Sequence, residues 1–81
     1  MQTKNINEAV TVNLLSWICR PRKKQWDLMV RGQKYPRATV FDNGVWHTWD
    51  RQGTGGENSH EETVDEAKRQ AAGAAVLQGF I

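Results

Sequence analysis

The stretch RATVFDNGVWHTWD (residues 37–50) decides the fold, because it has the pattern of a tight β-hairpin. Its Asn43-Gly44 pair lies between two short runs rich in β-branched and aromatic residues. The pair favours a two-residue type I′ turn, since both central residues of that turn need positive φ. We therefore expect antiparallel strands over residues 37–42 and 45–50.

The expected turn also sets which side chains share a face of the hairpin. A two-residue turn pairs Phe41 with Trp46 and Val40 with His47. One face then carries Ala38, Val40, Val45, His47 and Trp49, and the other carries Thr39, Phe41, Trp46 and Thr48. With Val40 in the core, Phe41 and Trp46 lie near solvent, where aromatic rings suit base stacking or a protein interface. The alternative is that these two rings pack on the loop 51–62 or on the N-terminal segment.

Two earlier segments extend the hairpin into a sheet. Residues 25–31 alternate apolar and polar side chains, which predicts a strand. Residues 6–18 fit a strand by their alternation and a helix by the spacing of their apolar residues, and both alternatives stay open. The polar, glycine-rich segment 51–62 is expected to be a loop.

The C-terminal segment predicts one helix over residues 64–78. Thr63 and Glu66 have the spacing of a capping box, which stabilises a helix N-terminus. Small apolar residues recur on one face at helical spacing: Val64, Ala67, Ala71 and Ala74. Alanine lets the helix approach the sheet closely, so the sheet has to supply the bulk of the core. Trp26 and Trp49 are the side chains best placed to do so.

Together these elements predict an α+β fold in a single domain, residues 1–81. An antiparallel sheet of three or four strands carries one C-terminal helix packed on one face. The chain is 38% hydrophobic and 25% charged, as in ordinary globular domains. It has no run of about 20 apolar residues for a membrane helix and no signal-peptide pattern. A lone cysteine, Cys19, cannot form an internal disulfide, so we expect a cytoplasmic protein.

The net charge of +2 hides an asymmetry along the chain. Residues 1–40 hold eight basic and two acidic side chains, whereas residues 41–81 hold three basic and seven acidic ones. Most of the basic side chains form a strip over residues 20–37: Arg20, Arg22, Lys23, Lys24, Arg31, Lys34 and Arg37. Such a strip can bind phosphates or an acidic protein surface. The alternative is a solvated turn whose charges keep an edge strand soluble.

Catalytic and metal-binding patterns are missing from the sequence. The glycine-rich run 53–56 lacks the Gly-Lys-Ser/Thr of a phosphate loop. His47, His60 and Cys19 do not have the spacing of metal ligands. We therefore expect no enzyme, no metal and no cofactor. The expected binding residues are Arg20, Arg22, Lys23, Lys24, Arg31, Lys34, Arg37, Phe41 and Trp46.

The segment from Asp65 to Leu77, following a strand hairpin, resembles the last helix of double-stranded-RNA-binding domains. The resemblance implies that a helix packs on an antiparallel sheet. In that family the helix begins with lysines that touch phosphates. Here the matching turn is acidic, and only Lys68 keeps a positive charge. The departure argues against the RNA-binding mode of that family.

Three runs of residues, 45–50, 53–58 and 63–68, resemble small uncharacterised proteins of bacteriophages and prophages. Such proteins are often accessory factors, including inhibitors of host defence such as anti-CRISPR proteins. The outline is also similar to the three-strand-plus-helix DNA-binding module of integrase arms. We expect a non-enzymatic phage-type protein, a monomer or homodimer, that binds a host protein or nucleoprotein complex in the bacterial cytoplasm. The alternative is a nucleic-acid-binding module that uses the strip 20–37.

Overall fold

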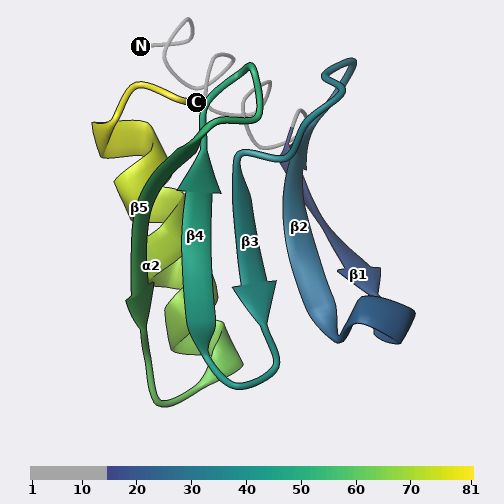
Figure 1. The fold of residues 1–81 in the computed structure, drawn as a ribbon, viewed down its shortest axis with the longest axis vertical. Coiled ribbons are helices and arrows are strands. Elements are labelled where there is room, and N and C mark those ends of the chain that lie inside the picture. Colours follow the sequence, from purple (N-terminus) through teal and green to yellow (C-terminus); the bar gives the residue numbers. More distant parts are fainter. Residues whose placement is uncertain (1–14) are drawn as a thin grey trace, which may run out of the picture.

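The structure, a computed structural model, describes residues 15–81 of the chain. Five antiparallel strands form one sheet in the order β1-β2-β3-β4-β5, and one helix packs across a face of it (Figure 1). The elements are β1 (Leu15–Arg20), η1 (Pro21–Lys23), β2 (Gln25–Val30), β3 (Ala38–Phe41), β4 (Val45–Trp49), β5 (Gly55–His60) and α2 (Val64–Leu77). The expected α+β fold is confirmed, with one strand more than expected. Within residues 15–81, no helix has the length and apolar character needed to span a membrane.

The segment 6–18, for which strand and helix were both expected, forms a strand in its described part. Residues 15–18 are extended, and Trp17 pairs with Leu28 of β2. The remainder of that expectation, residues 6–14, lies outside the described residues. The short helix η1 then turns the chain, and Lys24 adopts a left-handed φ of 53° at its end. The expected polar turn therefore includes one 3₁₀ turn.

Strand β5 lies where a loop was expected. Asp50 starts the reversal, because its Oδ1 accepts hydrogen bonds from the backbone N–H groups of Gln52 and Thr54. The chain then runs back along β4, and all six residues of β5 remain exposed. Backbone pairing holds this strand without an apolar face of its own. Its sequence therefore carries no alternation that could have predicted it.

The hairpin between β3 and β4 has a different turn from the one expected. Gly44 has a φ of +88° and donates its N–H to the Phe41 carbonyl, whereas Asn43 does not have positive φ. The loop is therefore a three-residue one with glycine in the left-handed position, and the type I′ expectation is wrong. A Cβ at Gly44 would collide with the carbonyl oxygen of Glu61. The register shifts by one residue, so that Val40 pairs with Trp46.

This shift exchanges the two faces of β4, because successive side chains on a strand point to opposite sides. Trp46 is 3% exposed in the core, and its Nε1 donates to Glu61 Oε2 at 3.1 Å. Trp49 lies on the opposite face. The expectations of an exposed Trp46 and a core Trp49 are both wrong for this one reason.

The core lies between α2 and the sheet, mainly over β3 and β4. Its buried members are Leu28, Ala38, Val40, Trp46, Ala67, Ala71 and Ala74. The alanines of α2 are buried as expected, and the bulk comes from the sheet. Thr63 Oγ1 accepts the Glu66 N–H at 3.1 Å, which caps the helix as its sequence predicts. Among residues 15–81, no helix packs on the face of the sheet away from α2.

Candidate functional site

The side of the sheet away from α2, here called the open face, carries a row of paired residues across all five strands. The row runs Ile18, Asp27, Thr39, His47 and Asn58, one from each strand in order. Arg20 and Gln25 share this face two residues further along β1 and β2. The open face is therefore mixed in polarity, which is unlike a surface that must be buried in a core.

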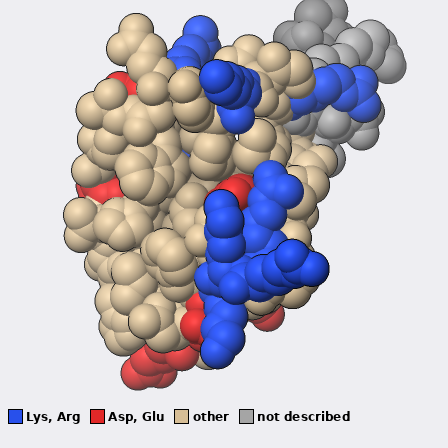
Figure 2. All heavy atoms as spheres, turned by 45° about the vertical axis from the view of Figure 1, so that its right-hand side comes forward, with Lys and Arg blue, Asp and Glu red and all other residues tan. Residues whose placement is uncertain are grey.

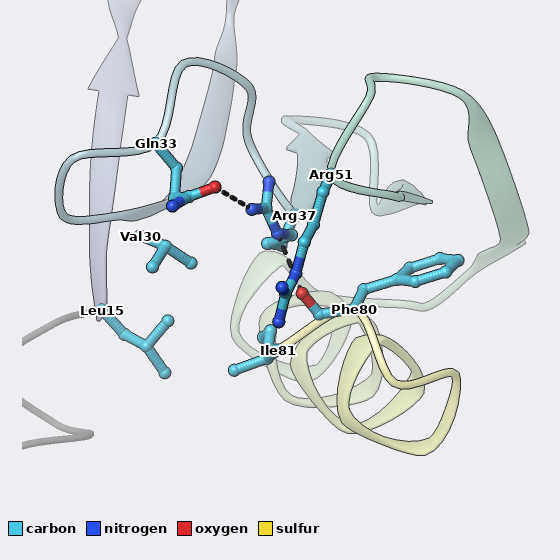
Figure 3. A pocket seen from close by; sticks show the side chains of 7 residues that line it. All are labelled: Leu15, Val30, Gln33, Arg37, Arg51, Phe80 and Ile81. Carbon is cyan, nitrogen blue, oxygen red and sulfur yellow. Dashed lines mark hydrogen bonds between the residues drawn. The ribbon is translucent and has the colours of Figure 1, made fainter.

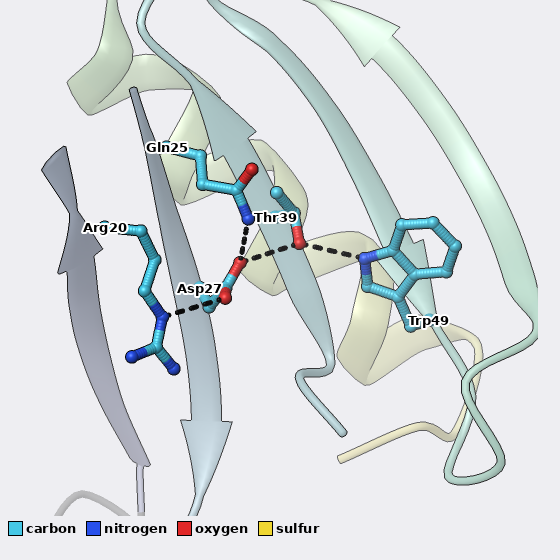
Figure 4. Close-up of polar contacts among 5 residues, drawn as sticks. All are labelled: Arg20, Gln25, Asp27, Thr39 and Trp49. Atoms are coloured by element: carbon cyan, nitrogen blue, oxygen red, sulfur yellow. Dashed lines mark hydrogen bonds and ion pairs between the residues drawn. The ribbon is translucent and has the colours of Figure 1, made fainter. Parts of the chain in front are cut away.

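Asp27 is the centre of a hydrogen-bond network on the open face, although it is only 8% exposed (Figure 4). Its Oδ1 accepts from Gln25 Nε2 and from Thr39 Oγ1, both at 3.0 Å. Its Oδ2 accepts from Arg20 Nε at 3.3 Å. Thr39 Oγ1 in turn accepts from Trp49 Nε1 at 3.0 Å. The network neutralises the carboxylate and fixes the side chains around it.

The aromatic rings of Phe41, His47 and Trp49 lie together beside this network and are here called the ledge. His47 stacks on Trp49 with ring centroids 5.7 Å apart and an interplanar angle of 26°. Phe41 meets His47 edge to face at 6.0 Å. All three rings are half-buried. Sequence reasoning named Phe41 as a contact residue, and the shift of register brings His47 and Trp49 to the same face.

A shallow trough of about 300 Å³ runs over the open face, beside the ledge. Its lining residues are Lys23, Gln25, Asp27, Tyr35, Pro36, Thr39, Trp49 and Gly53. Tyr35 is 39% exposed and packs on Gly53, where a Cβ would come within 3.3 Å of the ring. The trough therefore has aromatic walls, a polar floor and a lysine at its rim.

The basic turn, defined as Arg20, Arg22, Lys23 and Lys24, lies at one end of the sheet. The Lys24 carbonyl accepts the Asp42 N–H at 3.1 Å, which ties the turn to the β3–β4 hairpin. All four side chains are exposed, and Figure 2 shows Lys and Arg gathered there in one cluster. Lys23 belongs both to this turn and to the trough. The basic turn and the trough on the open face are therefore continuous.

The rest of the strip lies at the other end of β2, so the strip is not continuous. Arg31 and Lys34 are exposed there. Arg37 is 1% exposed and donates three hydrogen bonds: Nε to the Phe80 carbonyl, Nη1 to the Tyr35 carbonyl and Nη2 to Gln33 Oε1. Figure 3 shows the bonds to Phe80 and Gln33.

Burial lowers the pKa of Arg37 from its ordinary value, and the nearby Arg51 lowers it further. Its guanidinium joins the β2–β3 connection to the C-terminal segment. Arg37 therefore has a structural position rather than the exposed one expected. Trp46, buried under α2, is likewise withdrawn from any surface.

Within residues 15–81, no group of three or more His, Cys, Asp or Glu side chains is arranged to hold a metal ion. Cys19 is a free, exposed thiol. Asp27, the one buried carboxylate described here, already accepts three hydrogen bonds.

Of the residues that line the trough, the sequence prediction named only Lys23. One signal was present: Asp27 is the single acidic residue in the basic strip 20–37, and it lies on the polar side of an alternating strand. The contributions of Tyr35, Thr39 and Trp49 had no local signal, because the fold brings them together from separate segments.

Comparison with known proteins found no matching family model, no similar curated protein and no similar solved structure. Any functional proposal for this chain therefore rests on the arrangement of its own residues.

Proposed function

We propose that the protein is a non-enzymatic binding protein that holds nucleic acid on its open face. One observation carries the proposal: Lys23 of the basic turn lies at the rim of the trough whose walls are Tyr35 and Trp49. Cations that contact phosphates supply affinity, and aromatic rings stack on bases. A sheet covered by a helix on one side leaves both kinds of group accessible on the other.

The charge distribution supports the same surface. Among residues 15–81, no carboxylate lies within ion-pair distance of Arg22, Lys23 or Lys24. The exposed Asp42 lies next to the turn, where its N–H donates to the Lys24 carbonyl. Five other acidic residues lie elsewhere, on β5, on the connection to α2 and in the first turn of α2: Glu57, Glu61, Glu62, Asp65 and Glu66. A polyanion is therefore attracted to the β1–β2 end and repelled from the β5–α2 side.

A salt titration with labelled DNA and RNA tests the proposal. Phosphate binding makes the logarithm of the affinity fall linearly with the logarithm of salt concentration. Lys23→Glu is expected to weaken binding and to reduce that slope by about 1. Arg69→Glu, the same charge change on the exposed side of α2, is the matched control and should have little effect. Absence of binding to duplex DNA, duplex RNA and single strands at low salt would refute the proposal.

A second candidate is the phage-type protein that occupies an acidic surface on a host protein in the bacterial cytoplasm. The observation that favours it is a hollow at the basic turn in which Cys19 and Pro21 lie among the cations. Ile18, 36% exposed, adds apolar surface beside Arg20. Affinity capture from host lysate, with and without nuclease, separates the candidates. A partner protein retained after nuclease treatment and lost with Lys23→Glu supports this one.

A further inference from the structure

We infer that the trough receives an unpaired nucleobase, so that the protein prefers single-stranded nucleic acid to a duplex. This inference rests on the proposed nucleic-acid binding and specifies its substrate class. In a duplex, both faces of each base are stacked on neighbouring bases, and only the edges are accessible in the grooves. Aromatic walls can contact the face of a base only when that base is unpaired and unstacked.

The aromatic walls are held in place before any ligand binds. Trp49 is fixed by the hydrogen bond from its Nε1 to Thr39 Oγ1 and by stacking on His47. Tyr35 packs on Gly53, and a side chain there would crowd its ring. Rigid aromatic surfaces lose little side-chain entropy on binding, which makes stacking on them more favourable.

Gln25, which lines the trough, and Arg20, which lies next to it on β1, offer hydrogen-bonding groups that the network does not use. Gln25 uses Nε2 as a donor to Asp27, and its carbonyl oxygen points away from that carboxylate in Figure 4. Arg20 uses Nε, and its two terminal nitrogens also point away from Asp27. An acceptor and several donors therefore lie beside the trough. This combination suits the edge of a base, which presents both kinds of group.

Lys23 completes the match at the rim of the trough. When a base lies against Trp49 and Tyr35, the phosphate of the same nucleotide lies no further from it than the length of one nucleotide. The ammonium group of Lys23 is a suitable partner for that phosphate. The rest of the basic turn then lies where the neighbouring phosphates of an extended strand can run.

Abasic oligonucleotides separate base binding from phosphate binding. Fluorescence anisotropy compares three probes of equal length on the unmodified protein: a single strand, the same strand with abasic sites throughout its centre, and a duplex. Stacking of one base changes affinity by roughly tenfold or more, so the abasic strand is expected to bind at least tenfold more weakly. The duplex is also expected to bind more weakly than the single strand.

Tyr35→Ala provides the matching change on the protein. It should weaken binding of the intact strand about tenfold and leave binding of the abasic strand unchanged. Leu77→Ala, an exposed apolar truncation on α2, should change neither affinity.

The failures of the two proposals are distinguishable. Equal affinity for the intact and abasic strands, or tighter binding of the duplex, would overturn the base-binding inference while leaving nucleic-acid binding in place. No binding of any of the three probes would overturn both. The probe comparison needs only the unmodified protein, so it stands even if Tyr35→Ala fails to fold.

Discussion

Arg37→Met separates the structural position of this side chain from the binding role that its place in the basic strip predicts. Methionine has a comparable length and is apolar, so it fills the space without donating a hydrogen bond. The substitution removes the three hydrogen bonds from the guanidinium to the Phe80 carbonyl, the Tyr35 carbonyl and Gln33.

The expected loss of stability follows from these contacts. Each of the three bonds contributes a net of about 1 kcal/mol, because the freed acceptors lie near the surface and can bind water. Removing the desolvation cost of a guanidinium that is 1% exposed offsets part of this loss. The balance is about 2 kcal/mol of unfolding free energy, or a melting temperature lower by roughly 8–16 °C for a domain of this size.

Thermal denaturation followed by circular dichroism measures this effect. Arg31→Met is the matched control, since Arg31 lies exposed in the same connection between β2 and β3 and should tolerate the change. Binding of a single-stranded probe is measured at a temperature where both variants are folded, and Arg37→Met should bind like the control. A melting temperature within about 2 °C of the parent, against a scale of about 4–8 °C per kcal/mol, would refute the structural role of Arg37. So would loss of binding in the folded variant.

Two further substitutions test the hairpin and the network. Gly44→Ala should lower the unfolding free energy by about 2 kcal/mol or more, since alanine is disfavoured at positive φ and its Cβ would collide with the Glu61 carbonyl. Urea denaturation measures this loss, and an unchanged unfolding free energy would indicate a different turn. Thr39→Val should lower the unfolding free energy by about 1–3 kcal/mol, because Trp49 Nε1 loses its acceptor in a partly buried site. Its indole fluorescence should also shift as the ring loses its fixed position, and an unchanged melting curve would contradict the network.

Local sequence patterns predicted the elements whose causes are local. The strand expected over residues 25–31 and the helix over 64–78 each match the structure to within one residue, as β2 and α2. Alternation and capping act over a few neighbouring residues, so they are visible in the chain itself. The alanine stripe likewise predicted which side of α2 is buried.

Strand β5 shows what such patterns cannot predict. Its side chains are polar and exposed, and its extended form depends on hydrogen bonds to β4. A strand without an apolar face has no periodic signal, since it buries no side chains. The trough could not be predicted from local patterns either, because its lining comes from η1, β2, β3, β4 and the β2–β3 and β4–β5 connections.

The sequence alone determined that an Asn-Gly hairpin, a capped helix with an alanine face and a basic turn occur in this chain. Only the tertiary structure decided which face of the hairpin enters the core. Asn43-Gly44 is compatible with two turns that differ by one residue in register. The Glu61 N–H donates to the Gly44 carbonyl at 3.0 Å and its carboxylate accepts from Trp46 Nε1, so a residue distant in sequence stabilises one of the two turns. That choice buries Trp46 and leaves Trp49, His47 and Phe41 on the open face.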